Sequence, residues 1–176
     1  RRISSPARAR LALLALCLAA YAARLASLAY QSLWRDEVDS VRFALRPLAE
    51  LMGMFTTPGD NGPLFFLSLR PWLAVAGQSE FALRFPAAWA GVLAVPLTYA
   101  LARRLLSLAR RPARTLSLSN VPLVAALFIA CNPYLLWYSQ EGKMYALLVA
   151  LVLAVHLAFL AALERGRWWR WLLYLA

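Results

Sequence analysis

The sequence predicts an all-α integral membrane protein with four transmembrane helices, the start of a fifth, and juxtamembrane helices in its first extracytoplasmic loop. The 176-residue chain is 62% hydrophobic, which is more than the interior of a soluble domain of this length can bury. Its apolar residues gather in runs of about 20, the length of helix that crosses the ~30 Å hydrocarbon core. Its acidic residues and most of its arginines fall in different loops, as membrane topology requires.

The predicted spans follow from these apolar runs. They cover about 11–30, 85–106, 119–138 and 143–163, and a fifth opens at 168–176 with several aromatic residues typical of a membrane interface. Because the chain ends inside this last run, we interpret 1–176 as the N-terminal part of a larger polytopic membrane domain.

A further apolar segment, 61–79, is interrupted at its centre by Arg70 and Pro71. Proline breaks the helical hydrogen-bond ladder, and an arginine at the bilayer centre costs about 2.5–3.5 kcal/mol. We therefore expect this segment to lie against the outer leaflet or within the protein without crossing, so that 31–84 forms one long outer loop.

This topology places most basic residues on one side of the membrane and most acidic residues on the other. Twelve of the 19 basic residues would face the cytoplasm, and seven of the eight acidic residues would face the other side. The distribution satisfies the positive-inside rule, so we predict a multi-pass protein of the plasma (inner) membrane with a cytoplasmic N-terminus. The net charge of +11 is explained by topology, and no nucleic-acid partner is predicted because no basic cluster with interleaved aromatics appears.

The outer loop has helical periodicity between residues 38 and 52. Val41, Leu45, Leu48 and Met52 form an apolar stripe, and Pro47 is predicted to begin a second short helix. We expect a pair of interfacial helices followed by a turn at 56–63.

The first candidate site follows the first span at Asp36 and Glu37. Adjacent carboxylates on a helix point in different directions, so one can act as a general base while its neighbour orients a partner. Partial desolvation near lipid would raise the proton affinity of such a base. The alternative is a solvated helix start, where acidic residues interact favourably with the helix dipole.

The second candidate is the turn at Asp60 and Asn61, which either presents Asp60 to a cleft or caps the following helix. Arg84 is another outer cation, which either binds phosphate, anchors a span or pairs with Glu80 at i, i+4.

The third candidate joins two spans on the outer side. It offers a cation for phosphate, a carboxamide and a carboxylate for hydroxyl groups, and aromatic rings for the face of a sugar. The alternative is an ordinary interfacial hairpin with belt tyrosines and a snorkelling lysine. Its members are Tyr138, Gln140, Glu141, Lys143 and Tyr145.

Four motifs together resemble the C-type-fold membrane glycosyltransferases. The likeness is greatest to bacterial relatives of dolichyl-phosphate-mannose protein mannosyltransferases and of the aminoarabinose transferase of lipid A. The motifs are SLWRDEVDSV (32–41), DNGPLFFLSLRPW (60–72), SEFALRFPAAWAGVLAVPLTYALARRL (79–105) and NPYLLWYSQEGKMYALL (132–148), and they occur in the family's order.

The resemblance implies transfer of a sugar from a polyprenyl-phosphate donor to an extracytoplasmic acceptor hydroxyl in one inverting displacement. It assigns Asp36 as the general base with Glu37 beside it, and Lys143, aided by Arg84, as the cation that stabilises the leaving phosphate. The remaining candidate side chains become substrate-binding residues. The acceptor is left open as a lipid, a glycan or a protein.

The chain departs from the family at two positions. Gly62 stands where the family strip Asp-x-His-Pro-Pro usually has its histidine, and Lys143 stands where arginine is common. Some relatives use a divalent metal and others do not, so we assign no metal or other cofactor and leave a divalent metal open. The alternative function is a transporter or lipid-carrier protein, which would move its substrate without breaking a glycosidic bond.

Overall fold

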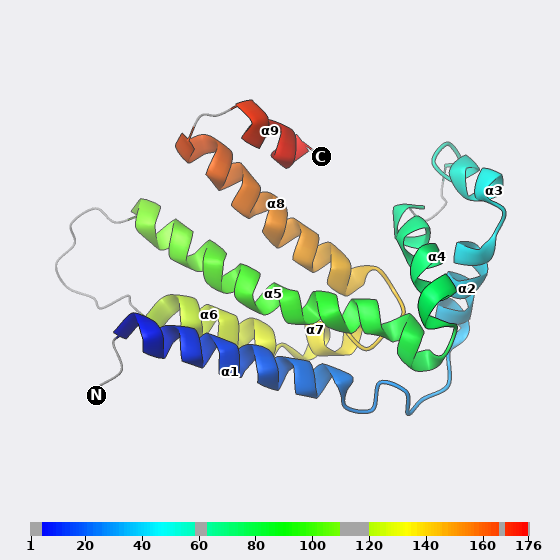
Figure 1. Ribbon diagram of the computed structural model, residues 1–176, viewed down its shortest axis with the longest axis horizontal. Helices are drawn as coiled ribbons and strands as arrows, with labels where there is room; N and C mark the ends of the chain where they lie inside the picture. The colour runs from blue at the N-terminus through cyan, green and yellow to red at the C-terminus, as the bar shows by residue number, and fades with distance from the viewer. Residues whose placement is uncertain (1–4, 59–62, 110–119, 166–167, 176) are drawn as a thin grey trace.

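The computed structural model describes residues 5–58, 63–109, 120–165 and 168–175 (Figure 1). Within these ranges every regular element is a helix, which confirms the predicted all-α class. The helices are α1 (Ser5–Leu25), α2 (Arg35–Leu45), α3 (Leu48–Gly53), α4 (Leu64–Ala76), α5 (Glu80–Ala109), α6 (Val121–Ala130), α7 (Pro133–Tyr138), α8 (Tyr145–Arg165) and α9 (Trp168–Leu175).

The long helix α5 is the centre of the structure and packs against α1, α6 and α8. Small residues line its contact with α8, where Ala87, Ala90 and Ala94 meet Ala146 and Ala150. Such side chains allow helix backbones to approach closely, which is how helices associate where lipid surrounds them.

Among the described residues, two helical segments are long and apolar enough to cross a membrane, namely Glu80–Ala109 and Tyr145–Glu164. Apolar side chains of α8 such as Leu148, Leu151 and Val155 are exposed, as expected of a lipid-facing surface. The full count of four spans and the start of a fifth stays a prediction.

The predicted span 119–138 is interrupted. Helix α6 ends at Ala130 and α7 begins at Pro133. The Asn132 side chain accepts a hydrogen bond from the Leu135 backbone N–H at 2.8 Å and caps α7, and proline at its first position cannot donate to the preceding turn. The first predicted span, 11–30, is likewise shifted, because α1 ends at Leu25 and turns follow to residue 30.

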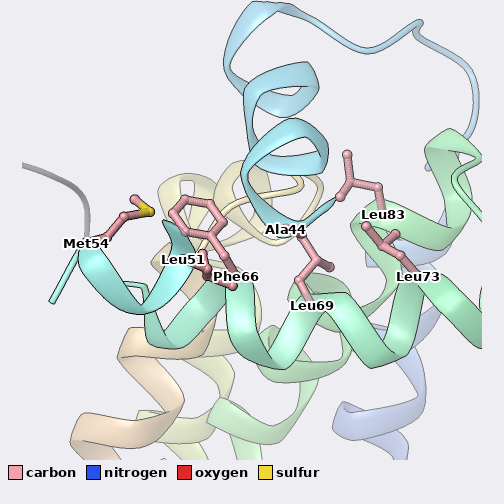
Figure 2. Close-up of a cluster of buried hydrophobic side chains, with 7 residues drawn as sticks. All are labelled: Ala44, Leu51, Met54, Phe66, Leu69, Leu73 and Leu83. Atoms are coloured by element: carbon pink, nitrogen blue, oxygen red, sulfur yellow. The ribbon is translucent and has the colours of Figure 1, made fainter. Parts of the chain in front are cut away.

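Helices α2, α3 and α4 pack together at one end of the bundle (Figure 1). Their shared core is shown in Figure 2. It consists of Ala44, Leu51, Met54, Phe66, Leu69 and Leu73, with Leu83 of α5. With 13 residues, α4 is about 20 Å long and too short to cross the ~30 Å hydrocarbon core. The structure therefore agrees with the prediction that the segment around Arg70 does not span.

The predicted helix break at Pro47 is confirmed, since α2 ends at Leu45 and α3 begins at Leu48. The apolar stripe predicted for these helices does not form their buried contact. Leu45, Leu48 and Met52 are exposed, and Ala44 and Leu51 are the buried positions.

Candidate active site

A buried ion pair joins α2 to the first turn of α5. Nε of Arg84 donates to Oε1 of Glu37 at 2.8 Å, and Nη2 donates to Oε2 at 2.7 Å. The Glu37 side chain is fully buried and that of Arg84 is 6% exposed. Two parallel charge-assisted hydrogen bonds fix both distance and orientation, so this pair sets the position of α2 on the bundle.

The other Arg84 donors reach the turn between α1 and α2. Nη1 donates to the carbonyls of Leu28 and Gln31, and Nη2 to that of Ser32. A guanidinium has five N–H donors, so these contacts and the two to Glu37 occupy them all. We therefore reassign Arg84 from phosphate binding to holding this turn, and its ion-pair partner is Glu37 rather than Glu80 one helical turn earlier.

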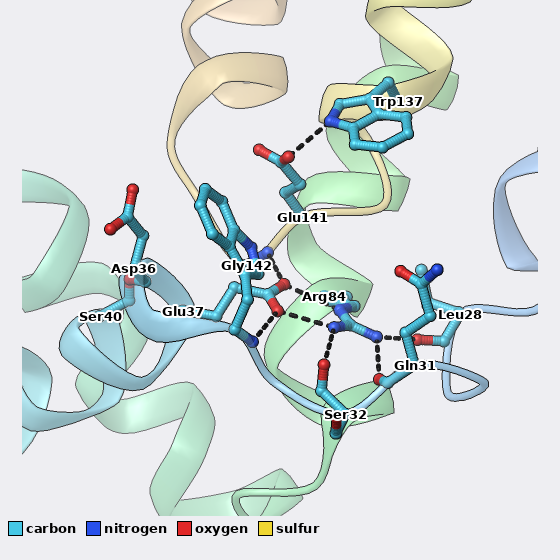
Figure 3. Close-up of polar contacts among 11 residues, drawn as sticks. Leu28, Gln31, Ser32, Asp36, Glu37, Ser40, Arg84, Trp137, Glu141 and Gly142 are labelled. Carbon is cyan, nitrogen blue, oxygen red and sulfur yellow. Dashed lines mark hydrogen bonds and ion pairs between the residues drawn. The ribbon is translucent and has the colours of Figure 1, made fainter.

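Glu37 also receives two backbone donors (Figure 3). The Gly142 N–H donates to Oε1 at 2.8 Å, and the Trp34 N–H donates to Oε2 at 3.4 Å. Burial by itself raises the pKa of Glu37, but hydrogen bonds from Arg84 and Gly142 outweigh it and hold the pKa below its usual range. Glu37 therefore stays ionised and acts as an orienting group.

Asp36 has a different environment from its neighbour. Its carboxylate projects away from Arg84 (Figure 3) and is partly buried. Among the described residues, no hydrogen bond or ion pair to this carboxylate is present, and only its backbone carbonyl accepts, from Oγ of Ser40. Of the two adjacent carboxylates, Asp36 is thus the one whose side chain has no hydrogen-bond or ion-pair partner within the described chain.

The corner between α7 and α8 carries Gln140 and Glu141. Gln140 Nε2 donates to the carbonyl of Ala26 at 2.9 Å, which attaches the corner to the end of α1. Glu141 Oε1 accepts from the Trp137 indole at 2.6 Å. Burial raises the pKa of Glu141, as do the nearby carboxylates of Glu37 and Asp36. Glu141 and Glu37 therefore differ in proton affinity, and Glu141 holds a proton more readily than Glu37 does.

Gln140 and Glu141 open onto a cavity of about 300 Å³. Aromatic and polar side chains form its wall, a mixture suited to a ligand with hydroxyl groups. It is lined by Ser27, Leu28, Tyr30, Gln31, Ser32, Trp34, Glu37, Arg84, Trp137, Gln140 and Glu141.

Lys143 lies in a second cavity, of about 260 Å³, whose wall is mostly apolar. The residue is 8% exposed, and within the described chain no ion pair or side-chain hydrogen bond of its ammonium group is present. This cavity is formed by α4, α5 and the start of α8, and its lining is Phe65, Ser68, Leu69, Trp72, Pro86, Ala87, Lys143 and Leu147. The two cavities share no lining residue.

Tyr138 and Tyr145 pack against each other with ring centroids 4.8 Å apart. They line a third cavity, of about 380 Å³, between α7 and α8. The structure thus separates these tyrosines from the carboxylates with which the sequence grouped them. Asp60 and Asn61 lie outside the described residues.

Comparison with known families decides the class of protein. The model of the dolichyl-phosphate-mannose-protein mannosyltransferase family matches residues 60–176, about two-thirds of the chain. The chain belongs to this family. Its members are glycosyltransferases of the C-type fold, as the sequence motifs indicated. Comparisons with curated proteins and with solved structures found no match.

In this mannosyltransferase-family chain the matched region begins after the Asp36 and Glu37 motif. The bonds from Arg84 and Gly142 attach that motif to the matched region. Sequence reasoning overlooked Gly142 as a donor and Trp137 as the partner of Glu141. The i, i+4 spacing of Trp137 and Glu141 was a visible signal, whereas nothing local marks a backbone N–H as a contact of Glu37.

The described residues contain no group of three or more His, Cys, Asp or Glu side chains arranged to hold a metal ion.

Proposed function

We propose that this protein transfers a sugar from a polyprenyl-phosphate donor to an acceptor hydroxyl, with inversion and with Asp36 as general base. The observation that carries the proposal is the double attachment of Glu37. By binding Arg84 and the Gly142 amide, Glu37 brings the carboxylates of α2 to the corner of the family-matched region. Membership of the family supports the glycosyl-transfer class.

The proposed reaction is a single displacement. The acceptor oxygen attacks the anomeric carbon, its proton passes to Asp36, and the bond from that carbon to the phosphate oxygen breaks. The electron pair leaves with the lipid phosphate. A positioned general base of this kind contributes about 10²–10⁴-fold to the rate. Glu37 remains ionised beside Arg84 and keeps Asp36 in place.

The two cavities suggest how the donor is divided. The apolar walls around Lys143 suit a prenyl chain, and a cation in a site of low polarity attracts the phosphate strongly as charge develops on it. The cavity at Glu141 has carboxylate and amide groups for hydroxyls and exposed indoles of Trp34 and Trp137 for a sugar face. We assign the lipid phosphate to the cavity at Lys143 and hydroxyl-bearing groups to the cavity at Glu141.

We also propose that this end of the bundle faces the extracytoplasmic side of the plasma (inner) membrane, with the N-terminus in the cytoplasm. The short helix α4 supports this orientation because it leaves the whole 31–84 loop on one side. The arginines of the opposite loops then follow the positive-inside rule.

The alternative is a transporter or lipid carrier. Transporters of many folds place their sites near the bilayer midplane, at broken helices. Here the paired carboxylates lie at the end of the bundle where α2 meets the start of α5, which favours an enzyme (Figure 1).

The test uses the full-length protein in vesicles with a polyprenyl-phosphate donor whose sugar is radiolabelled. We expect the label to become joined to an acceptor with inverted anomeric configuration, while free polyprenyl phosphate accumulates in equal amount. Vesicles without the protein are the control. Movement of the intact lipid-linked sugar across the membrane, with no new glycosidic bond, would instead establish the transporter.

A further inference from the structure

We propose that Arg24 is a positioning residue, which fixes the corner 139–142 and thereby holds the Gly142 amide on Glu37. The expected effect of Arg24 on catalysis rests on the proposed function. The claim that Arg24 holds the corner does not, because it concerns only the contacts of α1 with residues 139–142.

Arg24 lies in the last turn of α1 and is completely buried. Its Nε donates to Oγ of Ser139 at 3.2 Å, across 115 positions of the chain. Its Nη1 donates to the carbonyl of Ala20 at 3.2 Å and to that of Ala130 at 3.4 Å. One guanidinium therefore connects α1, the end of α6 and the residue that follows α7.

The charge of Arg24 is not matched by a carboxylate within the described chain. Instead it lies at the C-terminal ends of two helices, since α1 ends at Leu25 and α6 ends at Ala130. The C-terminal end of a helix carries partial negative charge, and unpaired carbonyls there accept hydrogen bonds. Nη2 of Arg24 is buried without a partner, so this site tolerates a desolvated donor to keep the guanidinium in place.

The corner is attached to α1 by a second residue. Gln140 Nε2 lies 2.9 Å from the carbonyl of Ala26 and 3.3 Å from those of Ala23 and Arg24. Ser139 also donates from its hydroxyl to the carbonyl of Leu135, which ties it to α7. Two consecutive side chains thus fix the backbone shortly before Gly142.

Gly91 of α5 provides the space for this arrangement. A β-carbon at residue 91 would overlap Oγ of Ser139 and lie 2.7 Å from Nε of Arg24. The absence of a side chain at Gly91 allows the guanidinium and the hydroxyl to meet against α5.

These contacts form a continuous path to the candidate base. Arg24 fixes Ser139, the corner presents the Gly142 N–H, and that N–H binds Glu37, the neighbour of Asp36. Displacing a reacting group by about 1 Å can cost on the order of 10²-fold in rate, so loosening the corner should lower turnover.

The experiment compares three variants of the full-length protein with wild type. Arg24→Met removes the donors but keeps a long unbranched side chain, and Ser139→Ala removes only the hydroxyl. Arg42→Met is the matched control, because Arg42 has a 76% exposed side chain on α2. Hydrogen exchange of the amides in 139–144 is measured alongside kcat and KM for the polyprenyl-phosphate sugar.

We expect Arg24→Met to speed exchange in 139–144 and to lower kcat by roughly 10- to 100-fold. KM for the sugar donor should rise as well, because Gln140 and Glu141 of the corner line the cavity for hydroxyl groups. Ser139→Ala should act in the same direction to a smaller extent, and it decides the question if Arg24→Met does not fold. Arg42→Met should match wild type. Unchanged exchange and unchanged kcat in a folded Arg24→Met or Ser139→Ala protein would overturn the proposal. If wild type transfers no sugar, the proposed function fails, and hydrogen exchange alone still decides whether Arg24 holds the corner.

Discussion

The backbone N–H of Gly142 donates to Oε1 of Glu37 at 2.8 Å, although 105 positions separate the two residues. The same oxygen accepts from Nε of Arg84. One carboxylate therefore gathers the start of α2, the start of α5 and the corner before α8 into a single site. The contribution of each of these contacts can be measured separately.

Gly142 has no room for a side chain. A β-carbon there would lie 2.5 Å from Cγ of Leu83, which is itself buried. We predict that Gly142→Ala lowers the free energy of unfolding by about 1–3 kcal/mol, the usual cost of overpacking. Thermal unfolding in detergent measures this change.

Gly53→Ala is the control for Gly142→Ala, because nothing lies within 4 Å of a β-carbon at residue 53. Leu83→Ala and Gly142→Ala together should destabilise the protein by less than the sum of the two single changes, because the shorter side chain at residue 83 leaves room for the new β-carbon. Equal stability of the two single glycine variants would contradict the tight contact.

The Glu37 and Arg84 pair should be costly to break from one side. Arg84→Met leaves a buried, ionised Glu37 without its partner, and such changes cost about 3–5 kcal/mol of unfolding free energy. Arg104→Met is the comparison, since its pair with Glu164 is partly exposed and pairs of that kind contribute about 0–1 kcal/mol.

Adding Glu37→Gln to Arg84→Met removes the unpaired charge and should recover stability. An Arg84→Met protein as stable as Arg104→Met would show that the buried pair does not hold α2 in place.

The stability of the protein should respond to pH through Glu141. Its raised pKa means that the folded state binds this proton more tightly than the unfolded state does. The resulting stabilisation is complete below the ordinary carboxyl pKa and is lost as pH rises through the folded pKa. Glu141→Gln should therefore melt at a higher temperature than wild type at neutral pH and at the same temperature in acid.

The control for Glu141→Gln is Glu50→Gln, which alters an exposed side chain of α3. The contribution of Glu37 to the pH dependence of stability has the opposite sign, because its lowered pKa gives stability that is lost as pH falls below the ordinary carboxyl range. A Glu141→Gln protein that melts below wild type at neutral pH would contradict the assigned shift.

The membrane orientation can be checked by cysteine labelling after Cys17 and Cys131 are replaced. We predict that Gln78→Cys and Ser32→Cys react with an impermeant reagent from the same side, because α4 does not cross. Ser107→Cys, at the other end of α5, should react only from the opposite side. Labelling of Ser32→Cys together with Ser107→Cys, with Gln78→Cys on the opposite side, would mean that the segment containing Arg70 spans the membrane.

Much of the fold was visible in the sequence, because hydrophobic periodicity and proline act locally. Pro47 ends one helix and begins another, and the Arg70 and Pro71 interruption marks a short helix. The break before Pro133 had the same kind of signal, but the continuous apolar run around it favoured one span. Length and hydropathy cannot show where a cap such as Asn132 interrupts that run.

The site was predictable only in part. Charge sorting predicted that Asp36 and Glu141 share one side, and the contact of Glu37 with Gly142 agrees with this. The partner of Arg84 was not predictable, because local spacing favours Glu80 while tertiary packing presents Glu37. The sequence also could not show that Lys143 lines a different cavity from Glu141, because residues close together in a loop can face different cavities.

The most direct test of the account is sugar transfer by Asp36→Asn. The substitution keeps the size of the side chain and removes its basicity, so transfer should fall by about 10²–10⁴-fold while folding and donor binding persist. Asp39→Asn, an exchange of the same kind three residues along α2, should transfer at close to the wild-type rate. A folded Asp36→Asn protein that transfers sugar as fast as wild type would contradict the assignment of Asp36 as the base.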